Sequence, residues 1–238
     1  KKCGFWQRFK AQQHISFEIV GKKEDIRFYV SCHKNNMELV EKQLSGAYPG
    51  VQVKEVDEYN IFEKQGKVEF VELALWSECF KPIKVFKELT PDPLSSMTAS
   101  LAKFSDGQAA AIQMIISPAE SVWSRMGEAY LAKTKKSEAD PEKAKFKMSP
   151  ADMEAIDNKI GKPGFLVTVR IVSTARTEGE AKSNLSNLKA TFAQFSNSMN
   201  GFSGKNIRFA NGFMVDFIYR YQSLFGNNSV MSSEELAT

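Results

Sequence analysis

The sequence predicts an α+β fold in which a ferredoxin-like β-α-β-β-α-β module is followed by a second, more helical α/β half. Two patterns lead to this prediction. Apolar residues alternate with polar ones in several short runs, as in half-buried strands, and elsewhere they recur every three to four residues, as on one face of a helix. The stretch DPLSSMTASLAKFSDGQAAAIQMIISP, residues 92–118, contains both patterns in order, with a turn at Asp106-Gly107 between them.

The predicted module occupies residues 15–118. An alternating strand at 15–19 comes first, and from residue 25 onward the order is strand, helix, strand, strand, helix, strand. These elements are expected at 26–30, 37–44, 51–56, 68–76, 93–104 and 112–116. Asp92 can cap the second helix, and Pro93 suits its first position because the missing N–H would be unpaired there. The apolar stripe of that helix consists of Leu94, Met97, Leu101 and Phe104.

The second half is expected at residues 119–229. It should contain helices at about 119–132 and from Ser149-Pro150 onward, a strand at 165–171, and a helix that Thr177 and Glu180 begin as a capping box. Residues 213–225 fit a strand and a helix equally well. Residues 133–147, KTKKSEADPEKAKFK, carry six lysines and three acids without an apolar period, which predicts an exposed, mobile linker. Alternatively, Lys133, Lys135 and Lys136 contact phosphate groups.

The net charge of +4 lies at the N-terminus, in a predicted basic arm of residues 1–14. Lys1, Lys2, Arg8 and Lys10 account for all of it, since residues 1–10 contain no acid. Aromatic residues are interleaved with these charges, a pattern that suits the surface of an anionic membrane. The four residues are therefore candidates for membrane or phosphate contacts. The rest of the chain sums to zero and lacks the broad basic surface of a nucleic-acid-binding domain.

Residues with recognisable chemistry are scarce. The cysteines Cys3, Cys32 and Cys79 form no C-x-x-C pair, and only two histidines accompany them, so no metal site is predicted. The stretch NGFSGKN at 200–206 fails as a phosphate loop because its glycines are too close together and Asn206 replaces the hydroxyl residue. No catalytic residue and no cofactor is therefore expected. The strand VEFVELALW also lacks the basic and aromatic run of an RNA-recognition module.

A series of segments resembles one protein family. The segments are ISFEIVGKKEDIRFYVSCHKNNMELVEKQLSGAYPGVQVKEVDEY, FKPIKVFKEL, DPLSSMTASLAKFSDGQAAAIQMIISPA, FLVTVRIVSTARTEGEAKSNLSNLKATFAQF and VMSSEELAT. Together they resemble the non-catalytic N-terminal region of HerA/FtsK-like ATPases of the conjugation and type IV secretion class. The resemblance implies that residues 230–238 begin the connection to a following ATPase domain. Because the sequence begins at Lys1 and not with Met, we expect it to be part of a longer protein.

The resemblance also implies a function and partners. The chain would be a non-catalytic assembly or docking domain of a bacterial DNA- or protein-transfer ATPase, at the cytoplasmic face of the inner membrane. Its partners would be its own ATPase domain, other subunits or secretion-system proteins, and an anionic membrane surface, with DNA reached through the full-length protein. Two other functions stay open at this point. One is a free-standing nucleic-acid-binding module with a ferredoxin-like fold, and the other is a small enzyme with an unrecognised site.

Overall fold

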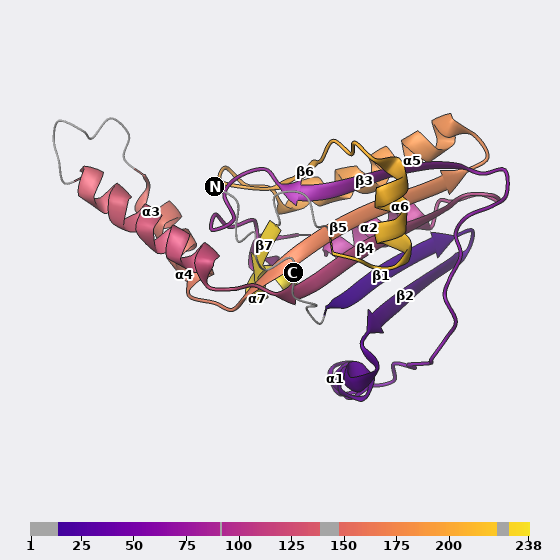
Figure 1. The fold of residues 1–238 in the computed structure, drawn as a ribbon, viewed down its shortest axis with the longest axis horizontal. Coiled ribbons are helices and arrows are strands. Elements are labelled where there is room, and N and C mark those ends of the chain that lie inside the picture. Colours follow the sequence, from indigo (N-terminus) through magenta and orange to yellow (C-terminus); the bar gives the residue numbers. More distant parts are fainter. Residues whose placement is uncertain (1–13, 91, 139–147, 223–228) are drawn as a thin grey trace.

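The computed structural model describes residues 14–90, 92–138, 148–222 and 229–238. These residues have a mixed α+β fold built on one seven-stranded antiparallel sheet (Figure 1). The strand order is β2-β1-β4-β5-β3-β6, and β7 pairs with β5 beyond the end of β3. The strands are β1 (Ile15–Lys22), β2 (Asp25–Cys32), β3 (Lys67–Leu75), β4 (Ala109–Pro118), β5 (Gly164–Ala175), β6 (Phe202–Gly204) and β7 (Ser229–Ser232). The helices are α1 (Met37–Ala47), α2 (Pro93–Leu101), α3 (Val122–Glu138), α4 (Pro150–Ile160), α5 (Glu178–Thr191), α6 (Ala210–Ile218) and α7 (Ser233–Leu236).

The predicted module of residues 15–118 is not closed on itself. The strand expected at 51–56 does not form, and β5 from the second half takes the place between β4 and β3. Val51, Val53 and Val56 are exposed, because an alternating apolar pattern can bury one face only where a sheet edge is available to pair with it. The order predicted for residues 25–117 is therefore wrong, whereas the α+β class is confirmed.

One face of the sheet is covered by α2 and α5, which lie behind it in Figure 1. α2 begins as predicted, since the Asp92 side chain accepts a hydrogen bond from the Leu94 amide at 3.0 Å and Pro93 follows the cap. Met97, Leu101 and Phe104 are buried, but Leu94 is exposed and Pro93 takes the inward position in the first turn. The core on this side contains Leu73, Leu75, Ile83, Met97, Leu101, Phe104, Ala110, Ile112, Val167, Val169, Ile171, Leu188, Phe192, Phe195 and Met231.

The Asp92 cap provides a first test of this packing. Replacing Asp92 with alanine is expected to destabilise the protein by about 1 kcal/mol, because the first turn of α2 loses the acceptor for one of its free amides. Urea unfolding of the two proteins measures the difference. Asp92→Asn is the matched control, since asparagine caps as well as aspartate, and its unfolding midpoint should stay close to that of the wild type. Equal losses in both variants would contradict a capping role.

The opposite face is covered by α6 and by residues 57–62. The ambiguous segment 213–225 is a helix up to Ile218, because Phe213 and Phe217 are four residues apart and both pack onto the sheet. Phe213 stacks on Phe70 of β3 with a centroid distance of 4.4 Å. α6 lies across the front of the sheet in Figure 1.

The helices α3 and α4 form a hairpin that projects from one end of the sheet (Figure 1). At its base, Trp123, Leu131 and Ile156 share one apolar cluster with Leu166 of β5 and Val230 of β7. Gly164 permits this contact, since a Cβ atom there would come within 2.4 Å of the Trp123 indole ring. α3 continues to Glu138, so the linker predicted at 133–147 is wrong for residues 133–138, and residues 139–147 lie outside the described part. Lysine and glutamate, which make up four of residues 133–138, are good helix formers, which explains how these turns form without an apolar stripe.

Candidate functional site

The predicted contact residues fall into two groups. Lys1, Lys2, Arg8 and Lys10 lie outside the described residues, so their proposed membrane or phosphate contacts stay a prediction. Lys133, Lys135 and Lys136 are exposed in the last turns of α3. There they complement the negative end of the helix dipole.

The C-terminal segment, residues 229–238, is docked against the sheet. β7 pairs with β5 from Gly164↔Ser232 to Val167↔Ser229, and the Ser229 side chain accepts a hydrogen bond from the Leu75 amide at 3.0 Å. Ser232 then begins α7 as a capping box with Glu235. This segment, which the resemblance placed at the start of a connection, is thus folded onto the domain.

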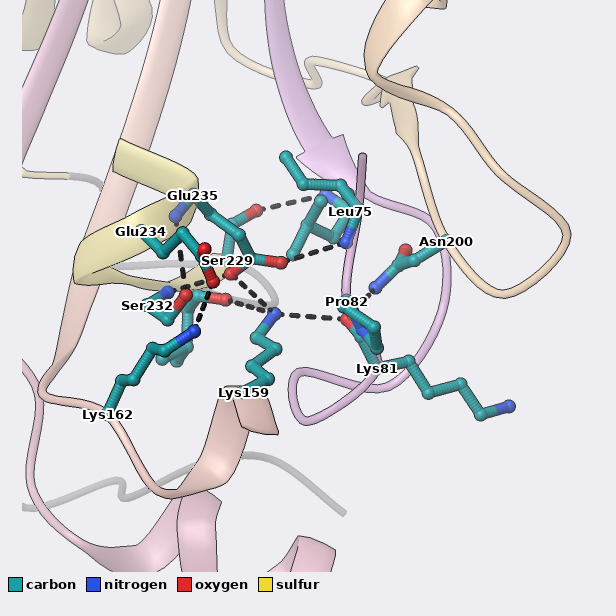
Figure 2. Close-up of polar contacts among 12 residues, drawn as sticks. Leu75, Lys81, Pro82, Lys159, Lys162, Asn200, Ser229, Ser232, Glu234 and Glu235 are labelled. Carbon is teal, nitrogen blue, oxygen red and sulfur yellow. Dashed lines mark hydrogen bonds and ion pairs between the residues drawn. The ribbon is translucent and has the colours of Figure 1, made fainter. Parts of the chain in front are cut away.

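A buried ion pair holds this segment in place. Lys159, near the end of α4, points toward Glu235 of α7, with 3.1 Å between Nζ and Oε2 (Figure 2). The two side chains are only 2% and 1% exposed. Lys159 also donates to the backbone carbonyls of Lys81 and Val230, both at 3.0 Å, so its three ammonium hydrogens all have acceptors.

Glu235 is equally well partnered. Its Oε1 accepts from the Ile83 amide at 2.8 Å, and its Oε2 accepts from the Ser232 amide at 2.7 Å. One carboxylate therefore links three elements: the end of α4, the loop after β3 and the C-terminal segment. Because both charges are out of water, each depends on the other for its stability.

Polar contacts continue around the pair. Asn200 donates to the Lys81 carbonyl at 2.9 Å (Figure 2). It also accepts from the Ser77 amide at 3.1 Å, and the two hydrogen bonds fix the loop after β3. At the surface, Glu234 pairs with Lys162, and this contact lowers the pKa of the Glu234 carboxyl. Lys87 also pairs with Glu234 at 3.6 Å, so the described part of the C-terminal segment is held by the buried pair and by two more exposed pairs at Glu234.

Burial lowers the pKa of Lys159, and the Glu235 carboxylate opposes that shift. A lysine with a lowered pKa can act as a nucleophile, but only if a substrate reaches it. The Lys159 ammonium is enclosed and all its hydrogens have acceptors, so the geometry is that of an anchor and not of a reactive amine.

A second polar cluster crosses the sheet beneath α6. Glu18, Gln113, Arg170 and Glu72 are direct neighbours in the strand register, on β1, β4, β5 and β3. Arg170 is fully buried and donates to Glu72 at 3.3 Å, to Gln113 at 3.2 Å and to the Asp216 carbonyl at 3.0 Å. Gln113 donates in turn to Glu18 and to the Phe217 carbonyl, both at 3.0 Å. This row ties the C-terminal end of α6 to the sheet.

The row has two features of an active site: it contains buried acids, and Tyr59, which neighbours Glu18, has a perturbed pKa. Burial raises the pKa of Tyr59, and the neighbouring Glu18 adds to the shift. However, the Glu18 carboxylate is itself buried and already accepts from Ser16, Gln113 and Arg220. Its acceptors are occupied within the protein, so the row acts as a structural network. Within the described residues no group of three or more histidines, cysteines and acids could hold a metal ion.

A comparison with protein families supplies one match. Residues 5–208 match the family described as a domain of unknown function, DUF8128. This chain belongs to the DUF8128 family. The DUF8128 match ends before α6, so the anchored C-terminal segment lies beyond it. No curated protein matches the chain. None of the helices in the described part of this DUF8128 chain is long and apolar enough to cross a membrane.

Sequence reasoning missed the charged residues of both clusters, although each left a signal. Lys159 lies three positions after the buried Ile156, at the edge of an apolar stripe. Ser232 and Glu235 have the spacing of a capping box. Arg170 faces the opposite side of the strand from Val169 and Ile171. The alternating pattern assigns that side to solvent, but the packing of α6 buries Arg170 there.

Proposed function

We propose that this chain is a non-catalytic assembly and docking domain of a bacterial DNA- or protein-transfer ATPase of the type IV secretion class. The observation that carries the proposal is the buried Lys159–Glu235 pair, which fixes the C-terminal segment to the domain. An ATPase domain that follows this segment, as the family resemblance implies, would be held in a defined position relative to the sheet. The two polar clusters support a structural and not a catalytic role, since Lys159, Glu235 and Glu18 all have hydrogen-bond partners within the protein.

The projecting α3–α4 hairpin is the proposed docking arm. Lys159 is near the end of α4, so a force on the hairpin acts directly on the pair that holds α7. Ion pairs and packed side chains that join rigid elements can carry coupling between distant sites. The partners of the arm would be other subunits or secretion-system proteins. The membrane contact of the basic arm and the location at the cytoplasmic face of the inner membrane belong to the same proposal.

We also propose that the ferredoxin-like arrangement is present but is built from other elements than the sequence indicated. Its units would be β3-α2-β4 and β5-α5-β6. The strand order supports this, because β5 lies between β3 and β4 while β3 lies between β5 and β6. Each unit is then a split β-α-β that encloses a strand of the other. The β1–β2 hairpin would be an edge addition and the α3–α4 hairpin an insertion between the units.

The proposal is tested first by the coding sequence beyond Thr238, where a phosphate-loop ATPase domain is expected in the same reading frame. In that longer protein, Lys159→Met/Glu235→Gln should leave nucleotide binding unchanged. Transfer of the DNA or protein substrate should fall roughly two- to thirtyfold, the size of a typical coupling free energy. Lys162→Met, at the partly exposed pair, is the matched control and should transfer normally.

Two results would contradict the proposal. One is a reading frame without an ATPase domain. The other is full transfer by the double variant once circular dichroism shows that it is folded. If the purified chain instead binds DNA tightly, and Lys133→Glu/Lys135→Glu/Lys136→Glu abolishes that binding, the alternative of a nucleic-acid-binding module is supported.

A further inference from the structure

The dipeptide Asn-Gly occurs twice in the chain, at Asn200-Gly201 and at Asn211-Gly212. This sequence is chemically labile, because the glycine amide nitrogen can attack Cγ of the asparagine side chain and glycine has no Cβ to hinder the approach. Ammonia leaves, and water opens the resulting cyclic imide to aspartate or isoaspartate. The reaction needs a side chain that can turn toward the glycine and an imide that water can reach. The structure provides these conditions at one of the two positions.

Asn200 is held in place against the loop after β3. It is fully buried, and its Oδ1 accepts a hydrogen bond from the Ser77 amide at 3.1 Å. Its Nδ2, the group that would leave, donates to the Lys81 carbonyl at 2.9 Å. The Gly201 amide donates its hydrogen to Oδ1 at 3.0 Å. Imide formation would break these buried hydrogen bonds, so this copy of the dipeptide is protected.

Asn211 and Gly212 are both exposed in the first turn of α6. Within the described residues, neither the Asn211 side chain nor the Gly212 amide has a hydrogen-bond partner. The first bonded amide of α6 is that of Phe213, which donates to the Phe209 carbonyl at 3.1 Å. Phe209 occupies the cap position and has no side-chain acceptor, so no side-chain cap holds this turn together. The Gly212 nitrogen is therefore free to approach Cγ of Asn211.

We propose that Asn211 is a site of spontaneous deamidation in the folded protein. The bond between the Gly212 nitrogen and Asn211 Cγ forms, the bond between Cγ and Nδ2 breaks, and Nδ2 leaves as ammonia with the proton that Gly212 loses. One water molecule then opens the imide. Attack at Cγ restores the main chain and gives aspartate, whereas attack at the main-chain carbonyl carbon gives isoaspartate. The reaction requires no other reactant, and the proposal does not depend on the docking function.

The two products affect α6 differently. Isoaspartate routes the main chain through the side-chain carbons, so the first turn loses the regular spacing of a helix and the bond from the Phe213 amide to the Phe209 carbonyl is lost. Phe213 anchors α6 on the sheet, where it stacks on Phe70. Aspartate keeps the helical main chain, and its carboxylate in the first turn is favourable to the helix dipole. Isoaspartate therefore loosens the helix that covers Arg170, and the loosened fraction grows with the age of the protein.

Mass spectrometry of the purified chain after incubation tests the site. Trypsin cleavage after Arg208 and Arg220 releases residues 209–220, which contain Asn211 and no other asparagine. The mass increase from amide to acid is expected at Asn211, and it should appear faster at mildly alkaline than at neutral pH because the glycine amide must lose its proton. Asn200 is the internal control and should stay unmodified until the chain is unfolded in urea. An unmodified Asn211, or equal rates at Asn200 and Asn211 in the folded chain, would overturn the proposal.

Two variants test the route and its effect. Gly212→Ala should fold normally, since the nearest side-chain atom to its new Cβ would be the Phe209 Cβ at 3.8 Å, and its methyl group should remove most of the deamidation. Deamidation of Gly212→Ala at the wild-type rate would contradict the imide route. Asn211→Asp represents the aspartate product and should keep wild-type hydrogen exchange in α6. The isoaspartate fraction of the aged chain, separated by ion-exchange chromatography, should exchange faster there, and exchange as slow as in Asn211→Asp would contradict the effect on α6.

Discussion

Replacing Lys159 with methionine is expected to destabilise the protein by about 3–5 kcal/mol, because the substitution leaves the buried Glu235 carboxylate without its cation. The methionine fills most of the space but offers no proton to Glu235. It also leaves the carbonyls of Lys81 and Val230 without the donor they have in the wild type. Urea unfolding at neutral pH measures the change in free energy.

Two controls separate the charge from the packing. Lys159→Met/Glu235→Gln removes both charges and should recover a large part of the loss, since replacing a whole buried pair is far less costly than breaking it. Lys162→Met breaks the partly exposed pair with Glu234 and should cost about 0–1 kcal/mol. If Lys159→Met lost no more than Lys162→Met, the buried pair would not be what holds the C-terminal segment.

Replacing Arg170 with methionine is expected to destabilise the protein by about 3 kcal/mol, the lower end of the range for a broken buried pair. Glu72 loses one of its two cations and keeps Lys205, while Gln113 and the Asp216 carbonyl lose the donor they have in the wild type. Arg170 also donates to the Asp216 carbonyl and lies over the Phe213 ring, 5.8 Å from its centroid. In the Arg170→Met variant, local unfolding should therefore be easiest at α6. Hydrogen exchange should show faster exchange in α6 than in α5, in addition to the lower unfolding free energy.

Arg208→Met is the matched control for this prediction. Arg208 is exposed just before α6, and substitutions of exposed residues usually change stability by less than about 0.5 kcal/mol. Its variant should keep wild-type exchange in α6. Uniform loss of protection across the whole sheet in Arg170→Met would show that the residue supports the global fold and not α6 in particular.

The positions of the helices and strands show how far local sequence patterns predict the structure. The helix at Asp92 and Pro93, the capping box at Thr177, and the strand around Val167 and Val169 all form where the sequence predicts them. Each depends on neighbours within a few residues, because caps and side-chain alternation are local properties of the backbone. Residues 133–138 were predicted as a linker but are helical. Their stability comes from helix propensity and not from the apolar stripe by which a helix is recognised in a sequence.

The partner of each strand could not be predicted in the same way. Val51, Val53 and Val56 have a strand pattern but no strand to pair with, whereas β5 separates β3 from β4 although it follows both in the sequence. Pairing depends on which edges are free when the chain collapses, and the alternation of one strand contains no information about that. The same limit applies to Arg170, which became a core residue only because α6 packs over it.

What the sequence determined by itself is the α+β class, most of the local elements and their caps. The tertiary structure alone decided the strand order and the burial of Lys159, Glu235 and Arg170. The physical reason is that helices and half-buried strands are specified by contacts between residues close in sequence. The buried ion pairs instead join residues 76 and 98 positions apart. Such charges are stable away from water only when folding brings both partners together, so no short stretch of sequence reveals them.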